Sequence, residues 1–158
     1  CMIDPEGNPK TLEFNCRFGD PETQPIMMRL QSDLVELVEA ALAGKLDTTT
    51  ADWDNRAAVG VVMAAANYPD EPRKGDVITG IPAAEATGAK VFQAGTSQQG
   101  ELIVTSGGRV LCVTALGDSV SLAQQAAYQA LNQVHFDGAF YRSDIGYRAI
   151  ERETANSN

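Results

Sequence analysis

Three polar side chains at alternate positions, Glu13, Asn15 and Arg17, mark the stretch of this 158-residue chain that is richest in chemical groups. The residues beside and between them are apolar: Leu12, Phe14, Cys16 and Phe18. Because side chains alternate between the two faces of a strand, the pattern predicts a strand over residues 12–18 with one apolar and one polar face. Neighbouring side chains on the polar face would stand ~6.6 Å apart, within reach of one ligand.

The polar face offers two kinds of binding chemistry. A glutamate carboxylate and an asparagine side-chain oxygen are ligands that Mg²⁺ accepts, usually one or two per ion beside water and phosphate oxygens. The planar guanidinium of Arg17 matches a phosphate or a carboxylate. The alternative is an ordinary solvated strand face that binds no ligand, because an antiparallel strand with one face in water shows the same alternation. Taken by itself, the pattern favours this alternative.

A charged loop follows directly, at residues 17–24. Gly19 permits a sharp turn, Pro21 stiffens it, and Asp20 and Glu22 place carboxylates on either side of the proline. Loops at strand ends commonly carry ligand-binding residues, so these side chains are candidates for a binding site. The alternatives are a plain solvated turn, or the start of the next helix at its last residues.

The overall composition excludes several classes of function. The formal net charge is −9 and the sequence pI about 4.5, which disfavours binding to nucleic acids or to anionic membrane surfaces. A phosphate ligand would therefore need a metal ion or a local cationic group. No apolar run approaches the ~20 residues of a membrane span. The spacing of Cys1, Cys16 and Cys112 fits no zinc motif. One disulfide is possible, but we expect free buried thiols in a reducing cytoplasm.

Periodicity predicts an α+β fold whose second part is β-rich with one main helix. A helix capped by Ser32 is expected to run to residue 43 and stop at Gly44, before a polar linker at 47–55. Strands are expected at 57–66, 76–81, 91–94, 102–105 and 110–115, with a hairpin turn at 106–109. The main helix is expected from Asp118 or Ser119 to about residue 134. A short strand or turn at 135–141 and a last helical turn within 145–152 complete the expected elements.

At residues 13–24 the sequence resembles the phosphoribosylamine–glycine ligase family, also called glycinamide ribonucleotide synthetases. The octapeptide Arg17–Gln24 is similar to a signature of that family, and Glu13 to Cys16 match the residues before it. The similarity extends through further segments along nearly the whole chain: residues 32–37, 60–64, 105–111 and 144–151.

The resemblance implies a fold, a reaction and a set of site residues. Family members use an ATP-grasp fold, in which ATP phosphorylates glycine and the amine of 5-phosphoribosylamine then displaces phosphate, giving glycinamide ribonucleotide in purine synthesis. Glu13 and Asn15 match the ligands of Mg²⁺ or Mn²⁺, and Arg17, Asp20, Pro21 and Glu22 match the segment lining the substrate side. No catalytic nucleophile or general base is implied, because positioning and charge neutralisation carry phosphoryl transfer. Arg109 could face an anion or merely flank a hairpin.

The resemblance also predicts the organisation of the chain. Residues 1–55 are expected to be the carboxy-terminal end of an ATP-grasp domain, residues 56–153 a small β-rich domain and residues 154–158 a disordered tail. The sequence corresponds to roughly the last third of a family member, so we expect a cytoplasmic fragment that lacks its amino-terminal part, is inactive alone and could self-associate. The alternatives are a non-catalytic β-rich interaction module and an ATP-grasp ligase with another acceptor.

Overall fold

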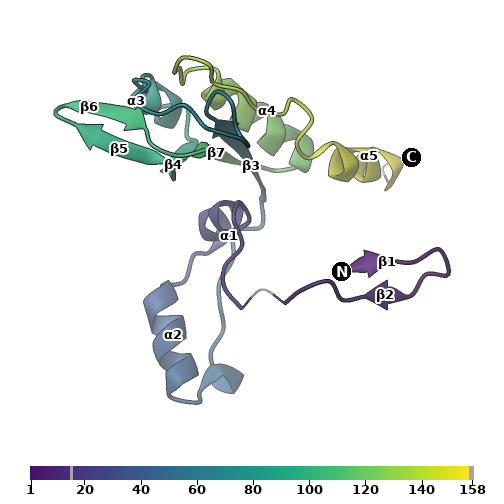
Figure 1. Ribbon diagram of the computed structural model, residues 1–158. Helices are drawn as coiled ribbons and strands as arrows, with labels where there is room; N and C mark the ends of the chain where they lie inside the picture. The colour runs from purple at the N-terminus through teal and green to yellow at the C-terminus, as the bar shows by residue number, and fades with distance from the viewer. Residues whose placement is uncertain (15, 157–158) are drawn as a thin grey trace.

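A computed structural model describes residues 1–14 and 16–156 of the chain, which mixes helices and strands (Figure 1). The strands are β1 (Met2–Ile3), β2 (Pro9–Lys10), β3 (Ala57–Ala64), β4 (Lys90–Gln93), β5 (Thr96–Gln99), β6 (Leu102–Thr105) and β7 (Arg109–Gly117). The helices are α1 (Thr23–Arg29), α2 (Leu34–Leu42), the short 3-10 helix η1 (Leu46–Thr48), α3 (Ile81–Glu85), α4 (Val120–Leu131) and α5 (Tyr147–Asn156).

The core forms around a three-stranded antiparallel sheet in the order β3-β7-β4. In β3, Val59, Val61 and Met63 alternate toward the core, as expected for a strand with one face against a helix. The central strand, β7, is buried over residues 110–115 because both of its edges are paired and both of its faces are covered. The strands predicted at 57–66, 91–94 and 110–115 therefore correspond to β3, β4 and part of β7.

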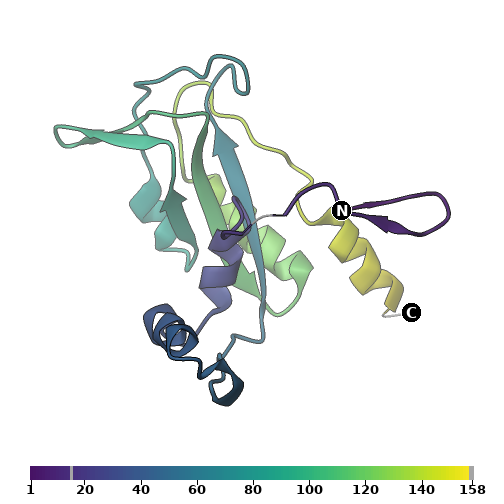
Figure 2. The same cartoon turned by 60° about the horizontal axis from the view of Figure 1, so that its bottom comes forward.

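Helix α4 covers the core face of this sheet (Figure 2). Ser119 is its N-cap, since its hydroxyl accepts a hydrogen bond from the backbone N–H of Leu122 at 3.1 Å. Ala123, Ala127 and Leu131 form its buried stripe, as the helical spacing predicts. The cap and the apolar stripe confirm the main helix.

Helix α1 contacts the opposite face of the same sheet (Figure 1). Gly60 makes this contact close: a Cβ at that position would lie 3.0 Å from Cys112 Sγ, 3.1 Å from Thr114 Oγ1 and 3.2 Å from Pro25 Cγ. A larger side chain would therefore push α1 away from the sheet. This contact joins the amino-terminal segment to the core.

Residues 1–55 otherwise contain no buried side chain among those the structure describes. The β1–β2 hairpin and α2 both extend away from the sheet (Figure 1). Helix α2 ends as predicted, because Gly44 has φ +67° and the N–H groups of Gly44 and Lys45 reach the carbonyls of Ala41 and Ala40. Its predicted N-cap was wrong by one residue: Asp33 accepts from the N–H of Val35.

The strand predicted over residues 12–18 is wrong for the residues that the structure describes there. Residues 11–14 and 16–19 have no helical or strand hydrogen bonding, and β2 ends at Lys10. The physical reason is that a strand needs a partner, and none of the described segments pairs with this one. The apolar face has nothing to pack against either, since Leu12 is 65% exposed and Phe14 86% exposed.

Sheet connectivity corrects a second prediction. The turn at 106–109 does not join a hairpin, because β6 pairs with β5 while β7 pairs with β3 and β4. The glycine-rich turn instead carries the chain from one sheet to the other. There the N–H groups of Ser106 and Gly107 both donate to the carbonyl of Gly95, at 2.7 and 3.2 Å.

Smaller differences concern residues 76–81 and the carboxy-terminal end. Only isolated bridges form at Val77 and Thr79, and Ile81 already begins α3. The last helix is longer than predicted, because α5 includes residues 154–156 of the expected disordered tail. The other two tail residues lie outside the described part of the chain. None of the helices in that part is long and apolar enough to cross a membrane.

Candidate functional site

Several of the predicted site residues line one open cavity in the segment that joins the β1–β2 hairpin to α1. The cavity has a volume of about 370 Å³ and is lined by Glu13, Arg17, Gly19, Asp20 and Glu22. Four of the six predicted site residues therefore line the same cavity, although the expected strand is absent. Asn15, the second predicted metal ligand, lies outside the described residues.

Local hydrogen bonds shape the loop on one side of the cavity. The carbonyl of Gly19 accepts from both the hydroxyl and the N–H of Thr23, the latter at 3.0 Å. The Asp20–Pro21 peptide bond is cis, and Glu22 occupies the N-cap position of α1. Pro21 thus lies in the turn that leads from the cavity into the helix.

Arg17 lies at the cavity with its guanidinium near its own backbone. One terminal nitrogen donates to the carbonyl of Phe18 at 2.9 Å. No ion pair within 4.0 Å joins it to a carboxylate elsewhere in residues 1–14 and 16–156. A guanidinium in this setting retains donors for a carboxylate or phosphate ligand.

Arg109 holds the loop from the other side, across 89 residues of sequence. Its Nη2 lies 3.0 Å from Asp20 Oδ2 and its Nη1 donates to the carbonyl of Asp20 at 3.1 Å. Arg109 thus faces an anion of the chain itself, the carboxylate of Asp20, and it flanks no hairpin because β6 and β7 are not paired. The ion pair anchors the candidate loop to the first residue of β7. Sequence spacing contains no signal for such a distant pair.

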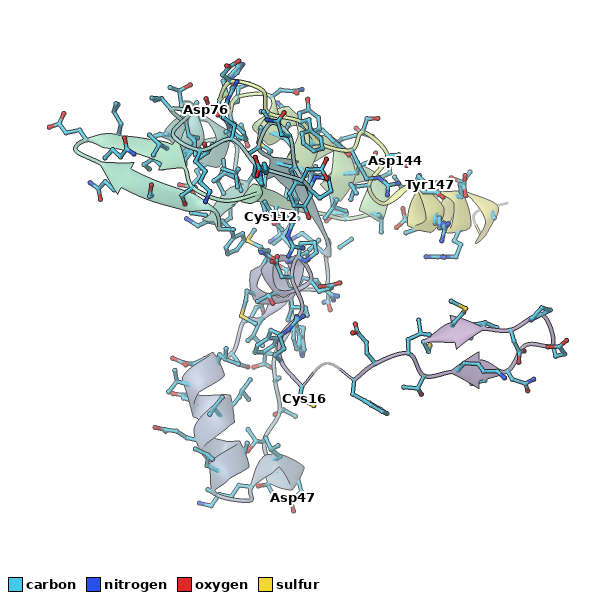
Figure 3. The ribbon with its side chains drawn as sticks, in the orientation of Figure 1. Cys16, Asp47, Asp76, Cys112, Asp144 and Tyr147 are labelled. Atoms are coloured by element: carbon cyan, nitrogen blue, oxygen red, sulfur yellow. The ribbon has the colours of Figure 1, made fainter. Side chains whose placement is uncertain are left out.

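Two buried polar groups, Gln24 and Cys112, belong to the elements that carry the loop. The side-chain oxygen of Gln24 is buried and accepts no hydrogen bond from the described residues. Burial raises the pKa of the Cys112 thiol, and the negative charge of Asp20 contributes to the same direction. Cys112 is therefore an unreactive buried thiol (Figure 3). The expectation of buried thiols was wrong for Cys1 and Cys16, which are free but exposed.

The donor set can be compared with the needs of a divalent cation. Within the described residues, no three His, Cys, Asp or Glu side chains lie close enough together to hold a metal ion. Magnesium commonly takes only one or two protein oxygens, and Glu13 presents a carboxylate to the cavity. Glu13 therefore fits such an ion in donor type, with further ligands to come from phosphate and water.

Comparisons with known proteins agree along the chain. The family model described as "Phosphoribosylglycinamide synthetase, C domain" matches residues 58–148. The chain is 64% identical to the phosphoribosylamine–glycine ligase of Vibrio cholerae over 154 residues, which are 98% of this chain and 36% of that protein. It is 61% identical to the corresponding ligase of Escherichia coli K12 over 153 residues, 96% of this chain and 36% of that one.

A solved structure gives the same assignment. The crystal structure of the phosphoribosylamine–glycine ligase of Thermotoga maritima superposes with a TM-score of 0.70 at 35% sequence identity, covering 91% of this chain and 35% of that one. The chain thus spans about a third of the length of the relatives that it matches. On the match to more than half of its residues, the chain belongs to the phosphoribosylglycinamide synthetase C-domain family.

Proposed function

We propose that this chain is part of a ligase that joins glycine to 5-phosphoribosylamine at the expense of ATP. The reaction would proceed through glycyl phosphate and give glycinamide ribonucleotide, ADP and phosphate in purine synthesis. The observation that carries the proposal is the cavity at which Glu13, Arg17, Asp20 and Glu22 meet, in a chain 64% identical to a ligase of that name. The family name and the acidic, arginine-bearing cavity favour it over a non-catalytic interaction module.

The charged residues of the cavity would bind different groups of the substrates according to the sign of their charge. Arg17 would hold an anionic group, either the glycine carboxylate or a phosphate, through its planar fork of donors. Asp20 and Glu22 would accept hydrogen bonds from an amine or from sugar hydroxyl groups, and Pro21 would keep their loop in one conformation. The ion pair between Arg109 and Asp20 would fix the loop relative to the sheet.

Glu13 and Asn15 would hold Mg²⁺ or Mn²⁺, which when bound supplies the positive charge that phosphoryl transfer from ATP requires. The carboxylate of Glu13 would orient that charge toward the substrate side. Most of the cavity is exposed to solvent in this chain, and exclusion of water from such a site requires a cover. We therefore propose that the rest of the longer ligase supplies the nucleotide contacts and the cover.

The proposed organisation assigns residues 1–55 to the end of an ATP-grasp domain and residues 56–153 to the small carboxy-terminal domain of the ligase. Because the first segment has so little packing of its own, the chain alone should not complete a turnover. The cytoplasmic location of the parent ligase stays a prediction. The partners would be ATP, glycine, 5-phosphoribosylamine and the amino-terminal part of the ligase.

The test is an assay of glycinamide ribonucleotide formation by the full-length ligase that contains this chain. Glu13→Ala and Asn15→Ala should each lower turnover by ~100-fold or more and raise the metal concentration needed for half activity, because a metal ligand is lost. Glu101→Ala, an exposed carboxylate in the β5–β6 turn, is the matched control and should leave turnover unchanged. Unchanged turnover in both site variants, with intact folding, would refute the assignment.

A further inference from the structure

A second cavity, distant in sequence from the candidate active site, opens at the beginning of α5. Its volume is about 450 Å³, and three arginines line it: Arg142, Arg148 and Arg152. Asp144 and Tyr147 also line it, and Figure 3 labels both where the chain enters α5. Three of the twelve lysine and arginine residues of an acidic chain thus meet at one hollow.

The single carboxylate among these five residues is already neutralised. Arg142 donates from Nε to Asp144 Oδ1 at 2.8 Å and from Nη2 to Asp144 Oδ2 at 2.7 Å. These hydrogen bonds lower the pKa of Asp144 and keep it ionised. The pair has no net charge, so the positive charge of Arg148 and Arg152 determines the charge of the cavity.

Arg148 and Arg152 form an arrangement that is unfavourable without a ligand. They lie four residues apart on one face of α5, where like charges repel. Neither forms an ion pair within 4.0 Å among residues 1–14 and 16–156. Arg148 instead donates from Nε to the hydroxyl of Tyr147 at 2.9 Å and lies 5.6 Å from the centre of its ring. An anion in the cavity would remove the repulsion.

The remaining carboxylates of α5 do not supply that anion. The carboxylate of Glu153 accepts hydrogen bonds from the N–H groups of Val120 and Ser121, at 2.8 and 3.4 Å. This contact attaches α5 to the first turn of α4 and so fixes the orientation of the cavity wall. Glu151 is exposed and does not line the cavity.

We propose that this cavity binds the phosphate group of a small phosphorylated molecule through Arg148 and Arg152, with Arg142 held beside them by Asp144. Guanidinium groups match phosphate oxygens in geometry and charge, and no acidic side chain lies in the first turn of α5 to repel a phosphate. The ligase reaction offers two sources, a phosphorylated sugar and free phosphate; this choice of source rests on the proposed function, whereas phosphate binding itself does not.

The experiment is a titration of the 158-residue chain followed by amide chemical shifts at constant ionic strength. Inorganic phosphate, ribose 5-phosphate and acetate are added in separate series. Saturable shifts for residues 142–152 are expected with at least one of the two phosphates, and weaker ones with acetate. Tighter binding of ribose 5-phosphate would identify a phosphorylated ligand, and tighter binding of inorganic phosphate would identify the free ion.

Charge-removing variants distinguish a specific phosphate site in the cavity from a general attraction of anions to positive charge on the chain. Arg148→Gln with Arg152→Gln should weaken binding about tenfold or more, since two charge-assisted contacts are lost. Lys45→Gln with Lys74→Gln removes the same charge at two exposed lysines elsewhere and should leave binding unchanged. If the glutamine variant loses the shifts typical of α5, Arg148→Lys with Arg152→Lys replaces it and should show intermediate weakening.

Three results would overturn the proposal: no saturable shift with either phosphate, equal affinity for acetate, or equal weakening in the lysine control. Because the measurement needs no turnover, it can fail while the ligase assay succeeds, or succeed while the ligase assay fails.

Discussion

The two parts of this chain, residues 1–55 and the region from residue 56 onward, differ in how far their apolar side chains are buried. Between Val59 and Phe136, apolar residues are buried in a sheet covered by α4, and all the buried hydrophobic side chains of the described residues lie in that range. In residues 1–55 comparable side chains remain in water, with Phe14 86% exposed and Leu42 85% exposed. Monomeric proteins rarely leave so much apolar surface uncovered, so the difference indicates surface that packs on something else.

The candidate active site lies mostly in residues 1–55, the part of the chain that buries no side chain in its described residues. Its loop is tied to the packed part by Arg109 and Asp20, while the Glu13 side of the cavity has no strand partner among the described residues. The packed region therefore acts as an anchor for one wall of the site. In our proposal, the Glu13 side of the cavity is completed by contacts with the rest of the ligase.

The largest expected effect tests whether burial really differs between the two parts. Leu131→Ala removes a fully buried side chain and should lower the free energy of unfolding by ~2–5 kcal/mol. Leu42→Ala, on exposed α2, should change it by less than ~0.5 kcal/mol. Urea denaturation monitored by circular dichroism measures both, and equal losses would remove the distinction.

The next effect tests the contact between the parts. Gly60→Val should cost ~1–3 kcal/mol, because the new side chain meets Pro25 on one side and Cys112 and Thr114 on the other. Amide exchange in α1 should rise while α4 stays protected. Gly60→Ala should show a smaller change in the same direction, and wild-type protection of α1 in both variants would mean that α1 is not held by this contact.

Much of this fold follows from sequence, and the failures share one cause. The stripe of α4, its Ser119 cap and the buried run of β7 are local patterns, and each predicts its element correctly. The alternation at residues 12–18 is equally regular, but a strand also needs hydrogen-bonding partners, which that segment lacks in the described chain. The turn at 106–109 was identified, yet which strands it serves depends on β3 and β4, distant in sequence.

The candidate site shows the same limit. Residue type identified the loop around Asp20, because charged groups beside glycine and proline form a recognisable pattern. Its anchor, Arg109, could not be found in this way, since the two residues lie 89 positions apart. Of the arginines of α5, Arg148 lies in the segment that resembles the family and Arg152 at the end of the expected last helical turn. Their repulsion depends on both lying on one face of a formed helix.

A smaller effect concerns that anchor. Arg109→Gln should cost ~0.2–1 kcal/mol, since both partners of the ion pair are about half exposed. The more sensitive measurement is amide exchange at Thr23, whose N–H donates to Gly19 within the loop and should become less protected. Lys90→Gln breaks an ion pair with Glu85 elsewhere and serves as the control. Equal protection of Thr23 in both variants would exclude an anchoring role.

The smallest effect is a dependence on pH at the boundary between the parts. Hydrogen bonds from Arg56 lower the pKa of Asp54 from 3.8 to about 2. Since the folded pKa lies below the ordinary value, this pair stabilises the chain above pH ~4 and its contribution disappears as pH falls toward 2. Arg56→Gln should return the pKa of Asp54 toward its ordinary value, as followed by carboxyl carbon shifts; an unchanged pKa would contradict the pairing.

The most direct test of the account compares amide hydrogen exchange in this chain with that in the full-length ligase. The sheet and α4 should be protected in both. Residues 1–14 and α2 should exchange rapidly in the isolated chain, where they bury no side chain, and slowly in the full-length protein, where we propose that they are covered. Protection of these segments in the isolated chain equal to that of α4 would contradict the account.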